Sequence, residues 1–111
     1  MAESIKRLGA LASTGVIGTA DTLYTCPAST STVVSSLIVC NRSSTAATYS
    51  LGVSGSASFS NAGQIVYQAS IAGNDTIGLT FGLTLDETNK YLLCSGSGST
   101  VSFSAFGSEI S

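Results

Sequence analysis

Three stretches of the sequence alternate between apolar and polar residues with a period of two. Residues 46–53 and Gln64–Ile71 place an apolar or aromatic side chain at every second position, and Thr76–Leu85 alternates most strictly. Successive side chains of a β-strand point to opposite faces, so this period predicts strands with one buried face. The residues expected to face the core are Ala47, Tyr49, Leu51, Val53, Ile65, Tyr67, Ala69, Ile71, Ile77, Leu79, Phe81, Leu83 and Leu85.

A fourth stretch, Ser31–Asn41, carries the densest run of β-branched residues and is bounded on both sides by turn residues. Such residues fit a pleated, half-buried surface, and the stretch is predicted to be the central strand of the fold. Residues 37–40 are apolar on both faces. Either the N-terminal segment closes over this strand, or its second face meets another subunit.

Shorter strands are predicted at residues 21–26, 91–95 and 101–106. Residues 4–11 form either a first edge strand or an arm that reaches a neighbour. Ten or more residues with a 3.6-residue period occur nowhere, and Gly, Ser and Pro turns separate the strands. Seven or eight short strands of this kind predict an all-β fold, an antiparallel β-sandwich that resembles a jelly roll. We divide the chain into an N-terminal arm or edge strand with a linker, residues 1–20, and a β-sandwich domain, residues 21–111.

Composition changes this picture in one respect. Hydrophobic residues make up 43% of the 111 residues, but charged residues make up only 9%, against about 25% in ordinary soluble domains. Gly78 and Gly82 fall on the outer face of one strand, where they leave room for another backbone. The composition therefore favours a subunit whose uncharged faces are covered by neighbours over a neutral monomer covered by Ser and Thr.

Charge and hydropathy also exclude some partners. The formal net charge is -2, and the one basic pair is Lys6 and Arg7, so no nucleic-acid partner is predicted. No apolar run approaches the length of a membrane span, and no membrane partner is predicted. The segment after Arg7 is too short and polar for the core of a signal peptide, so we expect synthesis in a cytoplasm.

Catalytic chemistry has few candidates. The chain has no histidine, which removes the commonest general base and metal ligand. Asp86 and Glu87 make at most a weak calcium site, and the glycine-rich residues 96–99 lack the lysine of a phosphate loop. The triplets that begin at Asn41 and Asn74 match the glycosylation pattern but are interpreted as turns. We predict no enzyme activity, no metal site and no cofactor.

The three cysteines are Cys26, Cys40 and Cys94, an odd number without metal-type spacing. If Pro27–Ser31 is a hairpin loop, Cys26 should face residue 32 or 33 of the next strand. Cys40 would then lie far along that strand, which disfavours a Cys26–Cys40 bridge. Two interpretations remain. The cysteines are free thiols that pack as small hydrophobes, or they form a disulfide between subunits after release into an oxidising medium.

Two regions of the chain carry a family resemblance. One comprises residues 22–42 (TLYTCPASTSTVVSSLIVCNR) with 45–49 (TAATY), and the other residues 72–85 (AGNDTIGLTFGLTL) with 101–111 (VSFSAFGSEIS). Over about residues 5 to 111 the chain resembles small virion structural proteins of tailed bacteriophages, decoration or tail-associated, including phages of marine and freshwater bacteria. The resemblance implies a protein made in the host cytoplasm, present in many copies in the virion and partnered by capsid, neck or tail proteins.

The resemblance and the composition together predict a bacteriophage virion structural protein. It would be an accessory decoration or cement subunit on the capsid or on the neck or tail, and it would form a homo-oligomer. The predicted subunit contacts are Ile5, Leu8, Val16, Ile17, Phe106 and Ile110, and Phe59 is a further aromatic candidate. The alternative is a receptor- or glycan-binding module of a fibre tip that uses the loops 54–63 and 96–99.

Overall fold

A computed structural model describes residues 3–15, 19–60 and 62–110, with Glu3, Ser4 and Phe81 described by their backbone alone. Over these ranges the chain forms eight β-strands and no helix. The strands are β1 (Glu3–Ala12), β2 (Asp21–Thr25), β3 (Ser31–Asn41), β4 (Ala47–Ser54), β5 (Gln64–Ile71), β6 (Thr76–Leu85), β7 (Tyr91–Gly96) and β8 (Val101–Ile110). The last strand is longer than predicted, because it continues through the segment after Phe106.

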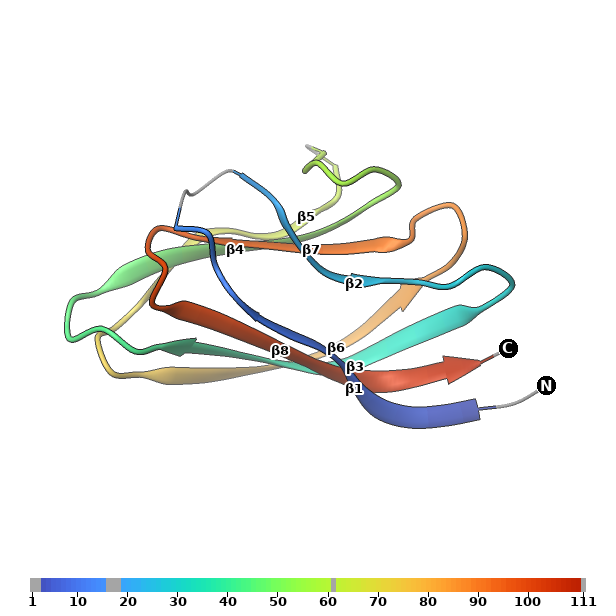
Figure 1. The fold of residues 1–111 in the computed structure, drawn as a ribbon, viewed down its shortest axis with the longest axis horizontal. Helices are drawn as coiled ribbons and strands as arrows, with labels where there is room; N and C mark the ends of the chain where they lie inside the picture. Colours follow the sequence, from blue (N-terminus) through green and yellow to red (C-terminus); the bar gives the residue numbers. More distant parts are fainter. Residues whose placement is uncertain (1–2, 16–18, 61, 111) are drawn as a thin grey trace.

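The strands build two four-stranded antiparallel sheets that stack face to face (Figure 1). Sheet A has the order β1-β8-β3-β6, and sheet B has the order β2-β7-β4-β5. Among consecutive strands only β4 and β5 lie in the same sheet, so nearly every connection crosses from one layer to the other. Both ends of the chain lie at the same end of the sandwich. The predicted antiparallel β-sandwich is confirmed.

The core fills the space between the two sheets. Phe103 of β8 is its largest fully buried side chain, and the Tyr49 ring of β4 meets it edge-on, with 6.5 Å between ring centroids and 61° between ring planes. This geometry is the favourable one for aromatic pairs. The largest other fully buried side chains of this core are Leu37, Leu51, Ile71, Leu85 and Leu92. The inward positions predicted for β4 and for the described side chains of β6 are confirmed, since each is buried or packs against this core.

The predicted facing of β5 is wrong over its first half. Tyr67 is 70% exposed and Ile65 is 44% exposed, whereas Val66 packs against the core. The cause is a bulge at Gln68, which adopts a φ of 48° and donates its backbone N–H to the Ser50 hydroxyl. A bulge inserts one extra residue and therefore reverses the facing of the residues on its far side. Alternation alone does not reveal such a slip.

The N-terminal strand forms the edge of sheet A. It pairs with β8 from Glu3↔Ile110 to Ala12↔Ser102, while β3 lies between β8 and β6. The N-terminal segment therefore joins the sheet beside β8 and does not cover the outer face of β3. On that face Ile38 is 39% exposed. Of the two explanations for the doubly apolar β3, closure by the strand β1 is ruled out.

Sheet A bends where three strands carry register shifts at one level. Around Phe106 of β8, the register shifts between Arg7 and Gly9 in β1 and between Val34 and Ser36 in β3. Opposite this point β6 contains one extra residue relative to β3, because Val34 pairs with Leu83 and Ser36 pairs with Thr80. Bulges increase the local twist of a strand, and the strands of sheet A curve along their length (Figure 1).

A buried asparagine holds the loops at the far end of the sandwich. The Asn41 side-chain amide donates to the carbonyls of Thr45 and Ala72, at 2.9 and 3.3 Å. Its side-chain oxygen accepts from the Ser43 N–H and the Thr100 hydroxyl. Asn41 is only 1% exposed, so its place in a glycosylation triplet is incidental, and it acts as a turn residue.

Candidate interaction surface

The outer face of sheet A is a broad surface with almost no charge. Along β3 and β8, buried residues alternate with residues that are exposed or half-buried, and the latter point away from the core. Arg7 is the one charged residue among the described side chains of this face. The outward residues are Ile5, Arg7, Ala10, Ala12, Ser31, Val33, Ser35, Ser36, Ile38, Cys40, Thr76, Gly78, Thr80, Gly82, Thr84, Ser102, Ser104, Phe106, Ser108 and Ile110.

The register arranges these residues in rows across the four strands. One row runs Gly78, Ile38, Ser104 and Ala10 from β6 to β1. A Cβ atom at Gly78 or at Gly82 would have no atom within 4 Å. The surface above these two glycines is therefore open, as their place on the outer face predicted, and small side chains leave the sheet accessible to another molecule.

Apolar side chains stand out from this neutral background. Ile5 is 84% exposed and Ile38 is 39% exposed, and Phe106 and Ile110 are half-buried on the same face. Scattered exposed hydrophobics are normal, but a group of them on one face with little charge marks a surface for interaction. The face thus carries exposed apolar side chains on a surface from which water can be removed at a low cost in free energy.

The six predicted contact residues fall into three groups. Ile5, Phe106 and Ile110 lie together on the outer face of sheet A. Leu8 packs against the core instead, because it follows the outward Arg7 and points to the opposite face of β1. Val16 and Ile17 lie outside the described residues. Ile38, the most exposed apolar residue of β3, was missed as a contact, although the doubly apolar pattern of its strand indicated such a residue.

The three cysteines are free thiols in this structure. Cys26 and Cys94 are buried, and burial raises the pKa of the Cys94 thiol well above its usual value. The Cys26 thiol lies 3.3 Å from the Thr32 hydroxyl, which confirms the predicted position opposite residue 32. Cys40 differs from both, because it is half-buried on the outer face of sheet A.

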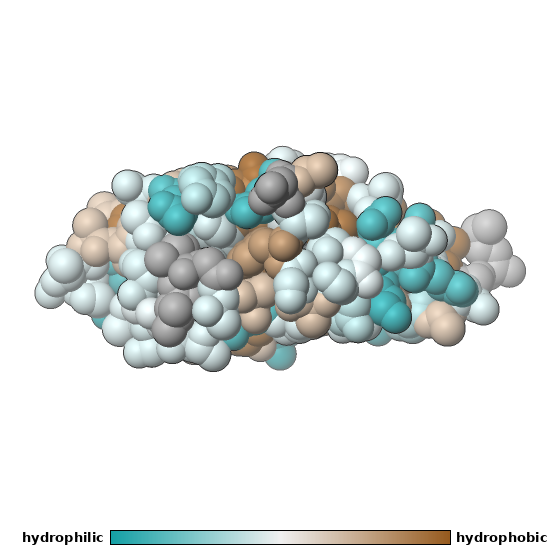
Figure 2. All heavy atoms as spheres, turned by 90° about the horizontal axis from the view of Figure 1, so that it is seen from above, coloured by the Kyte–Doolittle hydropathy of each residue, from teal (hydrophilic) through white to brown (hydrophobic). Residues whose placement is uncertain are grey.

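The outer side of sheet B is partly covered by the chain itself. Leu93 and Ser95 of β7 and Ser50 of β4 are buried, although outward positions of a bare sheet would be exposed. Phe59 lies against this side, since a Cβ atom added at Gly52 would lie 3.1 Å from the Phe59 ring. Figure 2 looks onto this side and shows mostly residues of intermediate hydropathy, with hydrophobic residues near the middle. Phe59 thus packs within its own chain.

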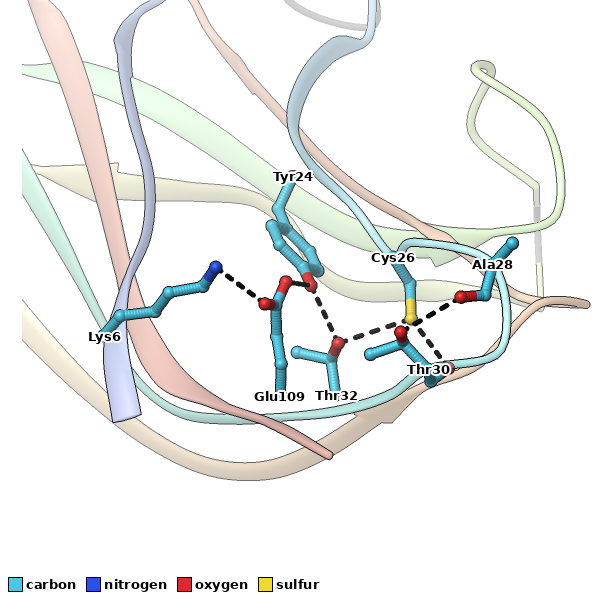
Figure 3. Close-up of polar contacts among 7 residues, drawn as sticks. All are labelled: Lys6, Tyr24, Cys26, Ala28, Thr30, Thr32 and Glu109. Atoms are coloured by element: carbon cyan, nitrogen blue, oxygen red, sulfur yellow. Dashed lines mark hydrogen bonds and ion pairs between the residues drawn. The ribbon is translucent and has the colours of Figure 1, made fainter. Parts of the chain in front are cut away.

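A polar cluster ties the two sheets together at the end where the chain termini lie (Figure 3). The Tyr24 hydroxyl of β2 donates to the Glu109 carboxylate of β8 and lies 2.8 Å from the Thr32 hydroxyl of β3. Lys6 of β1 pairs with Glu109 at 2.6 Å. One residue of sheet B thereby contacts two strands of sheet A, and a third strand joins through the lysine.

The cluster sets the protonation of its members. The hydrogen bond from Lys6, then that from Tyr24, lowers the pKa of Glu109 below its ordinary value. Burial, and next the hydrogen bond to Glu109, raises the pKa of Tyr24 far above its ordinary value. The tyrosine therefore stays neutral and keeps donating, while the carboxylate stays charged and keeps accepting. Lys6, Tyr24, Thr32 and Glu109 thus hold the two sheets together, and this cluster is called the clamp below.

The two adjacent acidic residues, Asp86 and Glu87, accept hydrogen bonds from the backbone of turns. Asp86 accepts hydrogen bonds from the backbone N–H groups of Thr88 and Asn89. Glu87 accepts one from the backbone N–H of Ser29 in the neighbouring turn. Within residues 3–15, 19–60 and 62–110, no three His, Cys, Asp or Glu residues gather as metal ligands would. The described part of the chain also contains no helix that could cross a membrane.

The sequence matches no protein-family model and no curated protein. Solved structures do match. A chain of the infectious bursal disease virus Gx strain gives a TM-score of 0.50 at 12% identity, with 97% of this chain and 31% of that chain covered. A chain of the cyanophage Pam1 capsid asymmetric unit gives 0.49 at 22% identity, with 96% and 83% covered.

A chain of the T13 particle of infectious bursal disease virus gives a TM-score of 0.49 at 16% identity, with 97% and 30% covered. The chain therefore spans about a third of the infectious bursal disease virus chains and most of the cyanophage chain. At these identities the likeness to the Gx strain shows a shared fold.

Proposed function

We propose that this chain is a structural subunit of a bacteriophage virion, an accessory decoration or cement protein on the capsid or on the neck or tail. The observation that carries the proposal is the outer face of sheet A, where apolar side chains stand on a surface whose one described charge is Arg7. The role is mechanical: the subunit stabilises the particle by the contacts it makes.

The physical argument rests on the cost of dehydration. A soluble monomer normally keeps about a quarter to a third of its surface charged, and removing charged groups from water is the main penalty of docking. A face of Ser, Thr, Gly and Ala around Ile38 and Phe106 avoids most of that penalty. A stable protein interface buries roughly 1,600 Å² in total, a scale that suits a four-stranded sheet face.

The fold supports the same proposal. Two four-stranded antiparallel sheets agree with the proposed jelly-roll-like sandwich, an architecture common in viral capsid and lectin domains. The likeness to a chain of a virus structure agrees with it, as does the sequence resemblance to phage virion proteins. The partners would be capsid, neck or tail proteins together with further copies of this chain.

The position of the thiols restricts any disulfide between subunits. Cys26 and Cys94 are buried within the sandwich, whereas Cys40 lies on the proposed docking face. A bridge to a neighbouring subunit would therefore use Cys40. Reducing and non-reducing electrophoresis of assembled particles, with a Cys40→Ser variant as the control, distinguishes this bridge from free thiols.

The test places a charge on the face and measures how much protein the particle retains. Ile38→Lys puts a cation at the centre of the face, and Ile38→Thr keeps a β-branched residue there while removing apolar area. Thr22→Lys adds the same charge at an exposed position of sheet B and is the matched control. Point variants are sharper than removal of the N-terminus, because β1 is a strand of sheet A.

We expect Ile38→Lys to lower the copy number in purified particles, counted by quantitative mass spectrometry, by roughly tenfold or more. Ile38→Thr should lower it less, and Thr22→Lys should leave it unchanged. Circular dichroism checks that each variant is folded. Equal occupancy of the folded Ile38→Lys and Thr22→Lys variants would reject this face, and absence of the protein from the particle would reject the function.

A further inference from the structure

We propose that two copies of this chain pair through β6, antiparallel about Thr80, and join their A sheets into one sheet of eight strands. The inference goes beyond the proposed function, because it names a contact that the isolated protein would form whatever its place in a particle. It rests on the edges of the two sheets, on their charges and on the sequence of β6.

Each edge strand exposes backbone N–H and C=O groups that can pair with another strand, and proteins usually protect such edges. Three of the four edges here are protected. Lys6 and Arg7 stand on β1, the five-residue β2 carries Asp21 and a register shift, and the bulge at Gln68 interrupts β5. Charges, shortness and bulges are the devices that discourage edge pairing.

The fourth edge, β6, is protected by neither charge nor shortness, and its first half, Thr76–Thr80, is regular. It is ten residues long, TIGLTFGLTL, and it contains neither charge nor proline. Its exposed and half-buried positions alternate regularly from Thr76 to Thr80 and again from Gly82 to Thr84, and Leu85 is buried. Its one irregularity is the extra residue between Thr80 and Leu83 relative to β3. A strand of this kind offers its unpaired edge to a partner.

The sequence of β6 reads almost the same in both directions about Thr80. An antiparallel pair of identical strands centred on Thr80 places Thr76 opposite Thr84, and Ile77 opposite Leu83. It also places Gly78 opposite Gly82, and Leu79 opposite Phe81. Every cross-strand pair then joins residues of the same kind, which is how sheet pairs are stabilised. The twofold symmetry is the commonest one for protein dimers.

The structure favours this self-pairing over a head-to-tail contact. Pairing β6 with β1 of another copy would bring Lys6 and Arg7 to an edge without a countercharge. Pairing β6 with β6 buries no charge at all. The dimer would extend the outer face of sheet A, the proposed docking face, across both copies.

The experiment measures the mass of the isolated full-length protein by sedimentation. We expect a concentration-dependent dimer for the native chain. Thr80→Lys places two lysines opposite each other at the twofold axis and should weaken the dimer by roughly tenfold or more, since like charges facing each other are destabilising. Thr22→Lys carries the same change on sheet B and should dimerise as the native chain does.

A charge-swap arm keeps the test decisive. Thr80→Glu should also be monomeric, while an equimolar mixture of Thr80→Lys and Thr80→Glu should form a heterodimer, because opposite charges then face each other. Restoration in the mixture cannot result from misfolding of either variant. A native chain that is monomeric at all concentrations, a dimer unaffected by Thr80→Lys, or a mixture without heterodimer would each overturn the proposal.

Discussion

Tyr24→Phe should destabilise the sandwich without changing its shape, because it removes only the hydroxyl that connects β2 to sheet A. That hydroxyl donates to Glu109 and lies 2.8 Å from the Thr32 hydroxyl. The Glu109 side chain is 16% exposed, so water replaces the lost donor poorly, whereas Lys6 is 47% exposed. The ion pair alone is therefore a weak substitute, since solvent-exposed pairs contribute about 0–1 kcal/mol.

The expected loss follows from these contacts. A hydrogen bond to a charged group contributes about 1.5–3 kcal/mol. The variant also loses the hydrogen bond between Tyr24 and Thr32, but the Thr32 hydroxyl keeps its contact with the Cys26 thiol at 3.3 Å and is not left without a partner. We expect the free energy of unfolding to fall by about 2 kcal/mol. For a domain of this size that corresponds to a drop of about 8 °C in Tm.

Urea denaturation and thermal melts of the isolated protein measure this loss. Tyr49→Phe is the matched control, because the Tyr49 ring is equally buried while its hydroxyl makes no hydrogen bond with a described residue. The control should change stability by less than about 0.5 kcal/mol. If both variants lost the same amount, or if Tyr24→Phe melted within about 2 °C of the native chain, the clamp would not be holding the sheets.

Three further outcomes follow from the structure. The pKa of Glu109 is lowered on folding, so its contribution to the free energy of unfolding is full above about pH 5 and is lost as the pH falls through the folded pKa. Urea titrations at several pH values measure the difference in stability between the native chain and Glu109→Gln, which should shrink below about pH 4. Asn41→Leu removes the partner of four groups in three loops and should cost about 2–4 kcal/mol, which chemical denaturation detects. Gly107→Ala should lower Tm, because its Cβ would lie 2.0 Å from the Val33 carbonyl oxygen, while Gly78→Ala meets nothing within 4 Å and should keep or raise it by reducing the freedom of the unfolded chain.

The strands were predictable because their signals are local. The bounds predicted for Ser31–Asn41, Gln64–Ile71 and Thr76–Leu85 are those of β3, β5 and β6. The facing of Tyr67 was not predictable, since it depends on a bulge held by Ser50, eighteen residues away. A period-two pattern specifies that a strand has two faces, but a single bulge decides which face meets the core.

The candidate surface could be predicted from the sequence only in part. The doubly apolar β3 indicated that something should cover Ile38, and the low charge indicated a neighbour. The clamp was missed, because its tyrosine and carboxylate lie 85 residues apart. One signal for it exists: Glu109 shares the alternation of Phe103, so it points inward, and an inward carboxylate requires a partner. Finding that partner required the sheet topology.

The native thiols allow the central claim to be tested without any substitution. Cys40 lies on the proposed docking face, while Cys26 and Cys94 are buried in the sandwich. Purified phage particles and the isolated protein are alkylated under identical native reducing conditions, and modification of each cysteine is followed by peptide mass spectrometry. The account predicts that Cys40 reacts in the isolated protein and is protected in the particle. Equal reactivity of Cys40 in both states, or absence of the protein from the particles, would contradict it.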